Sequence, residues 1–346
     1  MTVRLVIALV AGTALLAGCG DSAQWKESQS PRPSTAPSTA PPTALPTGVG
    51  VEPSAGVSAT ARPAGCTVFP NDNVWHADIS RLPVHPRSAA YVAGMGRAGN
   101  LHPDFGAGTI DGAAFGIPVT VVPPGQAGTR VRFDNPDESD RGLYPIPSNV
   151  RIEGGDGHII LFDRVRCRSS ELYDASRTGA GWHAGSGAIF DLRSNALRPA
   201  GWTSADAAGL SILAGLVRYD EVAKGRVDHA IRITVQRSQN AYIWPARHAA
   251  SSSSDRSLPP MGLRLRLKAG VPISGLPRQA RIIAQAMKTY GVIVADNGSS
   301  WFFTGTSDDR WDNEQLDALK TLTGADFEAV DESALRTSAN SGSAHR

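Results

Sequence analysis

Carboxylates, a histidine and tyrosines occur close together between residues 171 and 229, in short segments set off by glycine. Glu171 is two residues before Tyr173 in an expected strand, and Asp220 and Glu221 follow an arginine and a tyrosine. His229 falls on the apolar face of another expected strand. Hydrolysis of a glycosidic bond needs two carboxyl groups, one protonated and one ionised. The candidate catalytic residues are therefore Glu171, Asp220, Glu221 and His229.

Tryptophans, histidines and an arginine in the same part of the chain are candidates for substrate binding. Tryptophan packs well on the apolar face of a sugar ring, and a paired arginine and histidine can hold a uronate and move a proton, as a polysaccharide lyase requires. The residues expected to bind substrate are Trp182, His183, Trp202, Trp244, Arg247 and His248. The pattern favours a carbohydrate-active enzyme, a glycoside hydrolase or a polysaccharide lyase, acting on a polysaccharide or cell-wall glycan.

Structural roles for the same residues stay open. Asp220 and Glu221 can decorate a short surface helix, His229 can be a hydrogen-bonded core residue, and tryptophan fills cores as often as it binds ligands. With those roles the chain would be a non-catalytic glycan-binding or envelope-scaffold lipoprotein. Such a protein needs a tryptophan-lined face but no acid–base pair.

Several other kinds of chemistry lack their sequence signatures. No Walker loop is present, and Gly185-Ser186-Gly187 lacks the outer glycines of a nucleophile elbow. The glycines at 94–99 match a dinucleotide-binding pattern, but no strand is expected before them and no helix after them. The eight histidines are scattered, and the cysteines have no zinc-type spacing. We therefore expect no metal and no cofactor, and a net charge of +2 gives no reason to expect nucleic acid as a partner.

The N-terminus has the pattern of a secretion signal. Arg4 supplies a positive charge, residues 5–16 are apolar but too few to span a bilayer comfortably, and Leu-Ala-Gly precedes Cys19. This is similar to a bacterial lipobox, in which the cysteine is lipidated after cleavage; the alternative is a plain secretory signal. We expect a signal peptide over 1–18, a lipidated Cys19 and a disordered Pro-, Ser-, Thr- and Ala-rich tether over 19–64. The protein would then be a lipid-anchored monomer on the outer face of the cytoplasmic membrane.

Two further cysteines, Cys66 and Cys167, follow the tether. Thiols outside the cytoplasm tend to pair, and a bond across a loop of this length contributes roughly 4 kcal/mol. We therefore expect a disulfide between them. Two free buried thiols are the alternative.

A domain of short strands must position these candidate residues. Strands are expected at 117–122, 129–133, 157–165, 172–175, 188–192, 227–235, 263–268 and 292–295, where β-rich or alternating segments lie between turn residues. At 263–268 leucines alternate with Arg264, Arg266 and Lys268, which predicts one buried and one wet face. We expect one mainly β domain over 65–331, an antiparallel β-sandwich or jelly roll with a few short helices.

Helices are expected at 88–93, 277–290 and 314–322, and a capping box at Thr203 predicts a fourth. Asp296-Asn297-Gly298 predicts a turn after the strand at 292–295. Beyond Val330 the chain becomes polar, so residues 332–346 are expected to form a flexible tail.

Long motifs in the domain resemble a family of secreted and lipid-anchored proteins from soil bacteria and fungi. They are FPNDNVW (69–75), LHPDFG (101–106), GWTSADAAGL (201–210), WPARH (244–248) and ADNGSSW (295–301). The resemblance covers most of residues 66–331 and implies a shared domain. The family has no established activity, so it supplies no chemistry, and the reaction has to be argued from the residues.

Overall fold

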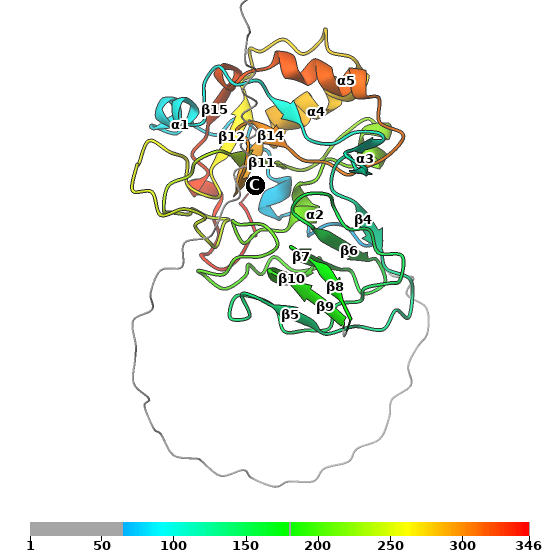
Figure 1. Ribbon diagram of the computed structural model, residues 1–346. Helices are drawn as coiled ribbons and strands as arrows, with labels where there is room; N and C mark the ends of the chain where they lie inside the picture. Colours follow the sequence, from blue (N-terminus) through cyan, green and yellow to red (C-terminus); the bar gives the residue numbers. More distant parts are fainter. Residues whose placement is uncertain (1–64, 180, 346) are drawn as a thin grey trace, which may run out of the picture. The chain divides into compact units, whose positions relative to one another are not determined.

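The computed structural model describes residues 65–179 and 181–345 (Figure 1). The chain divides into two units at Thr60/Ala61, and every described residue belongs to the second unit. The expected signal peptide (1–18), lipidated Cys19 and tether (19–64) lie outside the described residues. Within the described residues no helix is long and apolar enough to cross a membrane.

The largest sheet has six strands in the order β1-β14-β11-β13-β12-β15. Their bounds are β1 His102–Pro103, β11 Ile231–Val235, β12 Arg264–Leu267, β13 Val292–Asn297, β14 Phe302–Phe303 and β15 Phe327–Ala329. The central strands β11 and β13 are parallel, and their apolar residues are almost wholly buried. The helix α4 (Arg278–Thr289) contacts β12, so the middle of this sheet belongs to the main hydrophobic core.

A second sheet has four strands in the order β10-β7-β6-β4, and a ribbon of three strands, β5-β9-β8, follows the same part of the chain. The bounds are β4 Val119–Val121, β5 Val131–Phe133, β6 Ile159–Asp163, β7 Arg168–Tyr173, β8 Ser176–Thr178, β9 Gly181–Ala184 and β10 Ser186–Asp191. A short hairpin, β2 (Thr109–Ile110) and β3 (Ala113–Ala114), completes the strands of the described residues. Residues from this second sheet and the ribbon form a smaller hydrophobic cluster around Tyr144 and Trp182.

The remaining helices are short. They are α1 Ser88–Gly94, α2 Ile212–Gly215, α3 Tyr219–Ala223 and α5 Asn313–Asp317, with four 3-10 turns at Val74–His76, Ala318–Thr321, Gly324–Asp326 and Ser333–Leu335. The prediction of a mainly β fold with a few short helices is confirmed. Antiparallel pairings predominate, but β11/β13, β4/β6, β5/β9 and β1/β14 are parallel, so the sheets are mixed.

The predicted disulfide is present between Cys66 and Cys167, whose Cα atoms are 5.4 Å apart. It ties the start of the described domain to the turn that joins β6 to β7. The predicted helices at 88–93 and 277–290 are also confirmed, as α1 and α4.

The capping-box prediction at Thr203 is wrong, because no helix begins there. The Ser204 hydroxyl lies within hydrogen-bond distance of the Asp206 and Leu210 carbonyls, to either of which it can donate its single hydrogen, and it accepts from the Asp206 amide. A side chain that bonds its own backbone in this way holds the segment as a loop. The next helix, α2, starts only after Ser211, whose hydroxyl caps it by accepting from the Ala214 amide.

The prediction of a wet face on β12 is wrong for Arg264, which is fully buried. Its guanidinium donates to the backbone carbonyls of Val74, Ala77 and Tyr290. Carbonyl acceptors from two distant segments satisfy the donors that burial removes from water. The alternation at 263–268 therefore marks a strand whose arginine face is covered by the chain.

Residues 332–345, for which the sequence predicts a flexible tail, pack against the domain. The Gly342 carbonyl accepts from the Val74 amide at 2.7 Å, and the Gly342 amide donates to the Asn195 carbonyl at 2.6 Å. Leu335 and Ala344 are buried. Main-chain hydrogen bonds need no apolar sequence pattern, so composition did not reveal this packing.

Candidate functional site

Arg232 and two aspartates form the centre of a charged cluster at the six-stranded sheet. Arg232 lies in β11, Asp296 near the end of the neighbouring β13, and Asp206 in the loop before α2. The Arg232 Nε and Nη2 atoms donate to the two Asp206 oxygens at 3.0 and 2.7 Å, and Nη2 lies 3.4 Å from Asp296 Oδ2. Arg232 and Asp206 are buried, so this bidentate pair is the counter-charge that each needs inside the protein.

Asp296 is the member of the cluster that can exchange a proton near neutral pH. Burial raises the pKa of its carboxyl, the negative charge of Asp206 raises it further, and Arg232 and His158 oppose both effects; the result is a pKa of about 7. The Asp296 side chain is still 23% exposed. A carboxyl group that is accessible and half-protonated at neutral pH is suited to act as a general acid or base.

A buried histidine–glutamate pair adjoins this centre. His158 immediately precedes β6, its Nδ1 hydrogen-bonds with Glu153, and its Nε2 lies 3.1 Å from the Ala205 carbonyl. Burial alone would lower the pKa of His158, but the hydrogen bond and charge of Glu153 outweigh burial and raise it. Both ring nitrogens face acceptors, and this arrangement favours the protonated form of His158.

Two exposed carboxylates, Asp104 and Asp156, complete the cluster. Loss of hydration raises the pKa of Asp104, His102 opposes this, and Glu153 adds to it. The negative charge of Asp156 raises the pKa of Asp104 and that of His158. We call the set of seven the acidic site: Asp104, Glu153, Asp156, His158, Asp206, Arg232 and Asp296. It holds five carboxyl groups and two basic side chains.

Glu171, expected to be catalytic, has no access to solvent. Its two oxygens accept hydrogen bonds from the hydroxyls of Ser169 and Ser211, both at 2.7 Å, and from the amides of Ile212 and Leu213 at 2.7 and 3.2 Å. Four donors fill the acceptor sites of one carboxylate. In this structure Glu171 fastens the start of α2 to β7 and does not face a substrate.

Glu221 and His229 do come together, but below the surface. His229 Nε2 lies 3.1 Å from Glu221 Oε2, its Nδ1 lies 2.7 Å from the Ala230 carbonyl, and Arg218 pairs with the other Glu221 oxygen. His229 is 2% exposed. Asp220, on the same helix, points elsewhere and pairs with Arg310 at 2.9 Å. Glu221 is therefore paired inside the protein with Arg218 and His229.

The expected tryptophan platform is not formed. Trp182 is buried and Arg177 lies over its ring, while Arg198 lies over the half-buried Trp202. Trp244 is half-buried, and its indole N–H donates to the Ser341 carbonyl at 2.8 Å. None of the six tryptophans within the described residues is exposed. Their faces therefore pack against the protein's own chain.

The basic residues expected to bind substrate are also occupied. Arg247 is buried and donates to the carbonyls of Arg198 and Ala339 and to the Asn340 side chain. His248 is half-buried, with Nδ1 2.9 Å from the Ala207 carbonyl and Nε2 3.9 Å from Glu138. His183 lies in β9 and pairs with Asp134 at 3.0 Å. Only His248 lies near the acidic site, beside the loop that carries Asp206.

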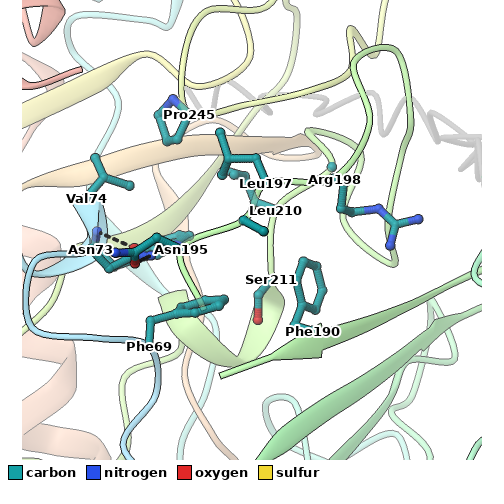
Figure 2. Close-up of a pocket in the computed structure, with 13 residues that line it drawn as sticks. Phe69, Asn73, Val74, Phe190, Asn195, Leu197, Arg198, Leu210, Ser211 and Pro245 are labelled. Carbon is teal, nitrogen blue, oxygen red and sulfur yellow. Dashed lines mark hydrogen bonds between the residues drawn. The ribbon is translucent and has the colours of Figure 1, made fainter. Parts of the chain in front are cut away.

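Two hollows among the described residues have none of the seven residues of the acidic site in their lining. The first is a small cavity of about 20 Å³ (Figure 2). It has room for about one water. Most of its lining is apolar, and in Figure 2 the Arg198 guanidinium points away from the other labelled side chains. The second is a groove of about 510 Å³ between α4 and residues 225–228, whose only carboxylate, Asp228, is paired with Arg226 at 2.7 Å. Neither holds a carboxyl group free for acid–base chemistry.

Sequence reasoning missed the acidic site, although two signals pointed to it. Arg232 stands between Ile231 and Ile233 in a mostly apolar strand, where a buried charge is kept only if it is paired. The sequence predicts a turn at Asp296, but β13 continues through this residue to Asn297. A charged residue within or at the end of a buried strand is therefore the sequence signal that points to this site.

No group of three or more histidine, cysteine, aspartate or glutamate side chains in the described residues is arranged to hold a metal ion. Comparison with known proteins adds no assignment: no family model, no curated protein and no solved structure matches the chain.

Proposed function

We propose that this protein is a carbohydrate-active enzyme, a glycoside hydrolase, and that Asp296 is its general acid. The observation that carries the proposal is the Asp296 carboxyl, 23% exposed and with a pKa of about 7, held beside the Arg232–Asp206 pair. Glycoside hydrolysis requires one carboxyl group that is protonated at working pH. The enzyme would act on a wall or environmental polysaccharide, anchored outside the cytoplasmic membrane through Cys19.

The acidic site contains the parts that such a reaction needs. Asp296 in its protonated form would donate to the oxygen of the scissile bond, and Arg232, 3.4 Å away, would stabilise the carboxylate that remains. Asp104 and Asp156 are exposed carboxylates of the same site, and either could activate a water molecule. Asp206 has another task, because it is fully buried and both its oxygens are bound by Arg232.

Hydrolysis fits the site better than elimination from a uronate. A lyase needs a free arginine to neutralise the uronate carboxylate, but Arg247 is spent on three internal acceptors and Arg232 on two aspartates. The five carboxyl groups of the acidic site outnumber its two basic side chains, and this excess of acidic groups would also repel an acidic polysaccharide. We therefore propose a neutral or basic glycan as the substrate.

Product release from a panel of polysaccharides tests this proposal. The full-length protein is incubated with neutral, amino-sugar and uronate polysaccharides, and reducing ends and the ultraviolet absorbance of unsaturated sugars are read together. We expect reducing ends alone, and a kcat lowered about 10²- to 10⁴-fold in Asp296→Asn. The exposed Asp191→Asn, at the end of β10, is the control and should keep wild-type activity.

The pH profile supplies a second readout. Because a general acid must be protonated, activity should fall as pH rises through about 7. Unsaturated products would instead identify a lyase. Retention on an insoluble glycan without any product would identify the non-catalytic binding protein, and either result would refute Asp296 as the acid of a hydrolase.

A further inference from the structure

Exposed aromatic rings are rare on this protein. Among the described residues only Tyr173, at 42%, and Tyr242, at 37%, are exposed; the phenylalanines and tryptophans are buried or half-buried. An exposed ring forgoes the free energy that burial would provide, and its flat, solvent-facing surface is able to contact a ligand. Tyr242 is followed by the exposed Ile243, in a loop. Tyr173 stands at the acidic site.

Strand register places Tyr173 there. In the antiparallel pair of β6 and β7, Ile159 is opposite Leu172, so the next pair along the strands is His158 with Tyr173. Their ring centroids are 5.7 Å apart, with the ring planes tilted by 51°. Directly opposed side chains in such a pair are in contact distance. The tyrosine ring therefore lies beside the histidine that is bonded to Glu153 and acts on the pKa of Asp296.

The neighbouring strand leaves space for this ring. Tyr173 pairs with Ser186 of β10, and the residue before it, Gly185, has no side chain. A Cβ atom at Gly185 would lie 2.9 Å from Tyr173 Cδ1, closer than carbon atoms approach without displacement. The ring thus lies against bare backbone on one side and is open to solvent on another.

Alternation along β7 explains why Tyr173 is exposed when Glu171, on the same face, is not. Helix α2 covers Glu171, since the Ile212 and Leu213 amides bind its carboxylate. Tyr173 is two residues further on, at the end of the strand. The same face of one strand is thus buried at Glu171 and open at Tyr173.

We propose that Tyr173 is the sugar-stacking side chain of the acidic site, on which the apolar face of a pyranose ring rests while its glycosidic oxygen reaches Asp296. This inference rests on the proposed function, because it concerns a substrate of the same site. A flat ring with an apolar face and a polar hydroxyl matches a sugar, which is apolar above and below its ring and polar at its edge. Tyr173 takes the role that the sequence assigned to the tryptophans.

The test compares Tyr173→Ala and Tyr173→Phe with the matched control Tyr242→Ala, all in the full-length protein. The substrate is the polysaccharide on which the wild type releases most reducing ends. We expect Tyr173→Ala to raise KM about tenfold and to change kcat by less than about twofold, because stacking acts on binding. Tyr173→Phe should stay near wild type, since it keeps the ring, and Tyr242→Ala should be unchanged.

The outcomes separate this inference from the proposed function. A Tyr173→Ala variant with wild-type KM on a cleaved substrate would overturn the stacking role and leave the hydrolase intact. If the wild type cleaves nothing, retention on insoluble chitin and insoluble β-glucan is measured instead. Weaker retention of Tyr173→Ala than of Tyr242→Ala would then support sugar stacking on Tyr173 in a protein that is not an enzyme. Equal retention of the two variants, or no retention of the wild type, would overturn the stacking role.

Discussion

The carboxyl groups of this protein differ less in type than in what surrounds them. Glu171 accepts four hydrogen bonds and is closed off from solvent. Glu221 lies between two basic side chains, those of His229 and Arg218. Asp296 is partly exposed and shares its arginine with Asp206. Hydrogen-bond donors occupy Glu171 and basic side chains occupy Glu221, whereas Asp296 has a pKa of about 7 and remains able to exchange a proton.

Glu221→Gln should destabilise the protein by about 2 kcal/mol at pH 7. Burial alone would raise the pKa of Glu221, but His229 and Arg218 outweigh burial and lower it to about 2. A carboxyl group with a lowered pKa stabilises the folded state above its unfolded pKa of about 4.5, and this contribution is lost as pH falls through 2. Urea unfolding at pH 7 and at pH 3 measures both effects.

The control for that change is Asp220→Asn, one residue away. Asp220 is 63% exposed and pairs with Arg310, itself 55% exposed. An exposed ion pair contributes little, so the free energy of unfolding should change by less than about 1 kcal/mol. Equal losses in the two variants would show that burial of Glu221 does not set its contribution.

Secondary-structure elements bring the acidic site together. The parallel neighbours β11 and β13 carry Arg232 and Asp296, and the loop with Asp206 is attached to β13 where the Ala208 amide donates to the Ala295 carbonyl at 2.9 Å. The Arg247 amide then donates to the Ala208 carbonyl at 2.8 Å. Arg247, expected to bind substrate, thus supports the loop that holds Asp206.

Gly291→Ala should destabilise the turn between α4 and β13. Gly291 has a φ of 72°, and a Cβ there would lie 2.2 Å from the Leu265 carbonyl oxygen. A left-handed backbone combined with a backbone clash should lower the free energy of unfolding by about 2–4 kcal/mol. Gly270→Ala, where a Cβ would meet nothing within 4 Å, is the control and should stay within about 1 kcal/mol of wild type in thermal unfolding.

Glu332, at the start of the C-terminal segment, should make the free energy of unfolding depend on pH. Glu332 is 4% exposed, and its carboxylate lies 3.5 Å from Arg264 Nη1 with no well-formed hydrogen bond. Burial raises the pKa of Glu332 to about 7, against the attraction of Arg264 and with a small addition from Asp331. A raised carboxyl pKa means that stability is lost as pH rises from about 4.5 to about 7.

Glu332→Gln keeps the shape of the protonated side chain and should remove part of the loss of stability that occurs as pH rises. We expect the variant to be about 3 kcal/mol more stable than wild type at pH 8 and nearly equal at pH 4.5. Chemical denaturation across this pH range measures the slope. The exposed Glu314→Gln should retain the wild-type slope, and a Glu332→Gln variant that also retains it would refute the assignment.

At the scale of the whole described domain, distant parts of the chain are fastened to one another. The disulfide joins Cys66 to Cys167 across 101 positions. In the C-terminal segment, Ser341 bridges to Ala196 and Ser343 to Asn73. The indole of Trp244 and the guanidinium of Arg247 also bind this C-terminal segment. Residues that the sequence suggests for ligand binding therefore bind the C-terminal segment to the rest of the domain.

Replacement of both Cys66 and Cys167 by serine should lower the free energy of unfolding by about 4 kcal/mol, because the unfolded chain loses a long cross-link. Urea unfolding with and without reductant measures the effect. Reductant should bring the wild type to the level of the variant and leave the variant unchanged. Wild-type stability that resists complete reduction would contradict the prediction.

The sequence by itself determined the mainly β class, the positions of α1 and α4, and the pairing of Cys66 with Cys167. Apolar periodicity and residue type decide such features, and both are local or compositional. Which charged groups face solvent and which are spent on internal partners depended on the tertiary structure. Glu171 and Asp296 are both acidic residues of β-strands. Their different roles, Glu171 binding the start of α2 and Asp296 being the candidate acid, depend on neighbours that are distant in the sequence. Those neighbours come from segments 40 to 90 positions away, at Ser211 and Asp206, so no window of sequence could have shown them.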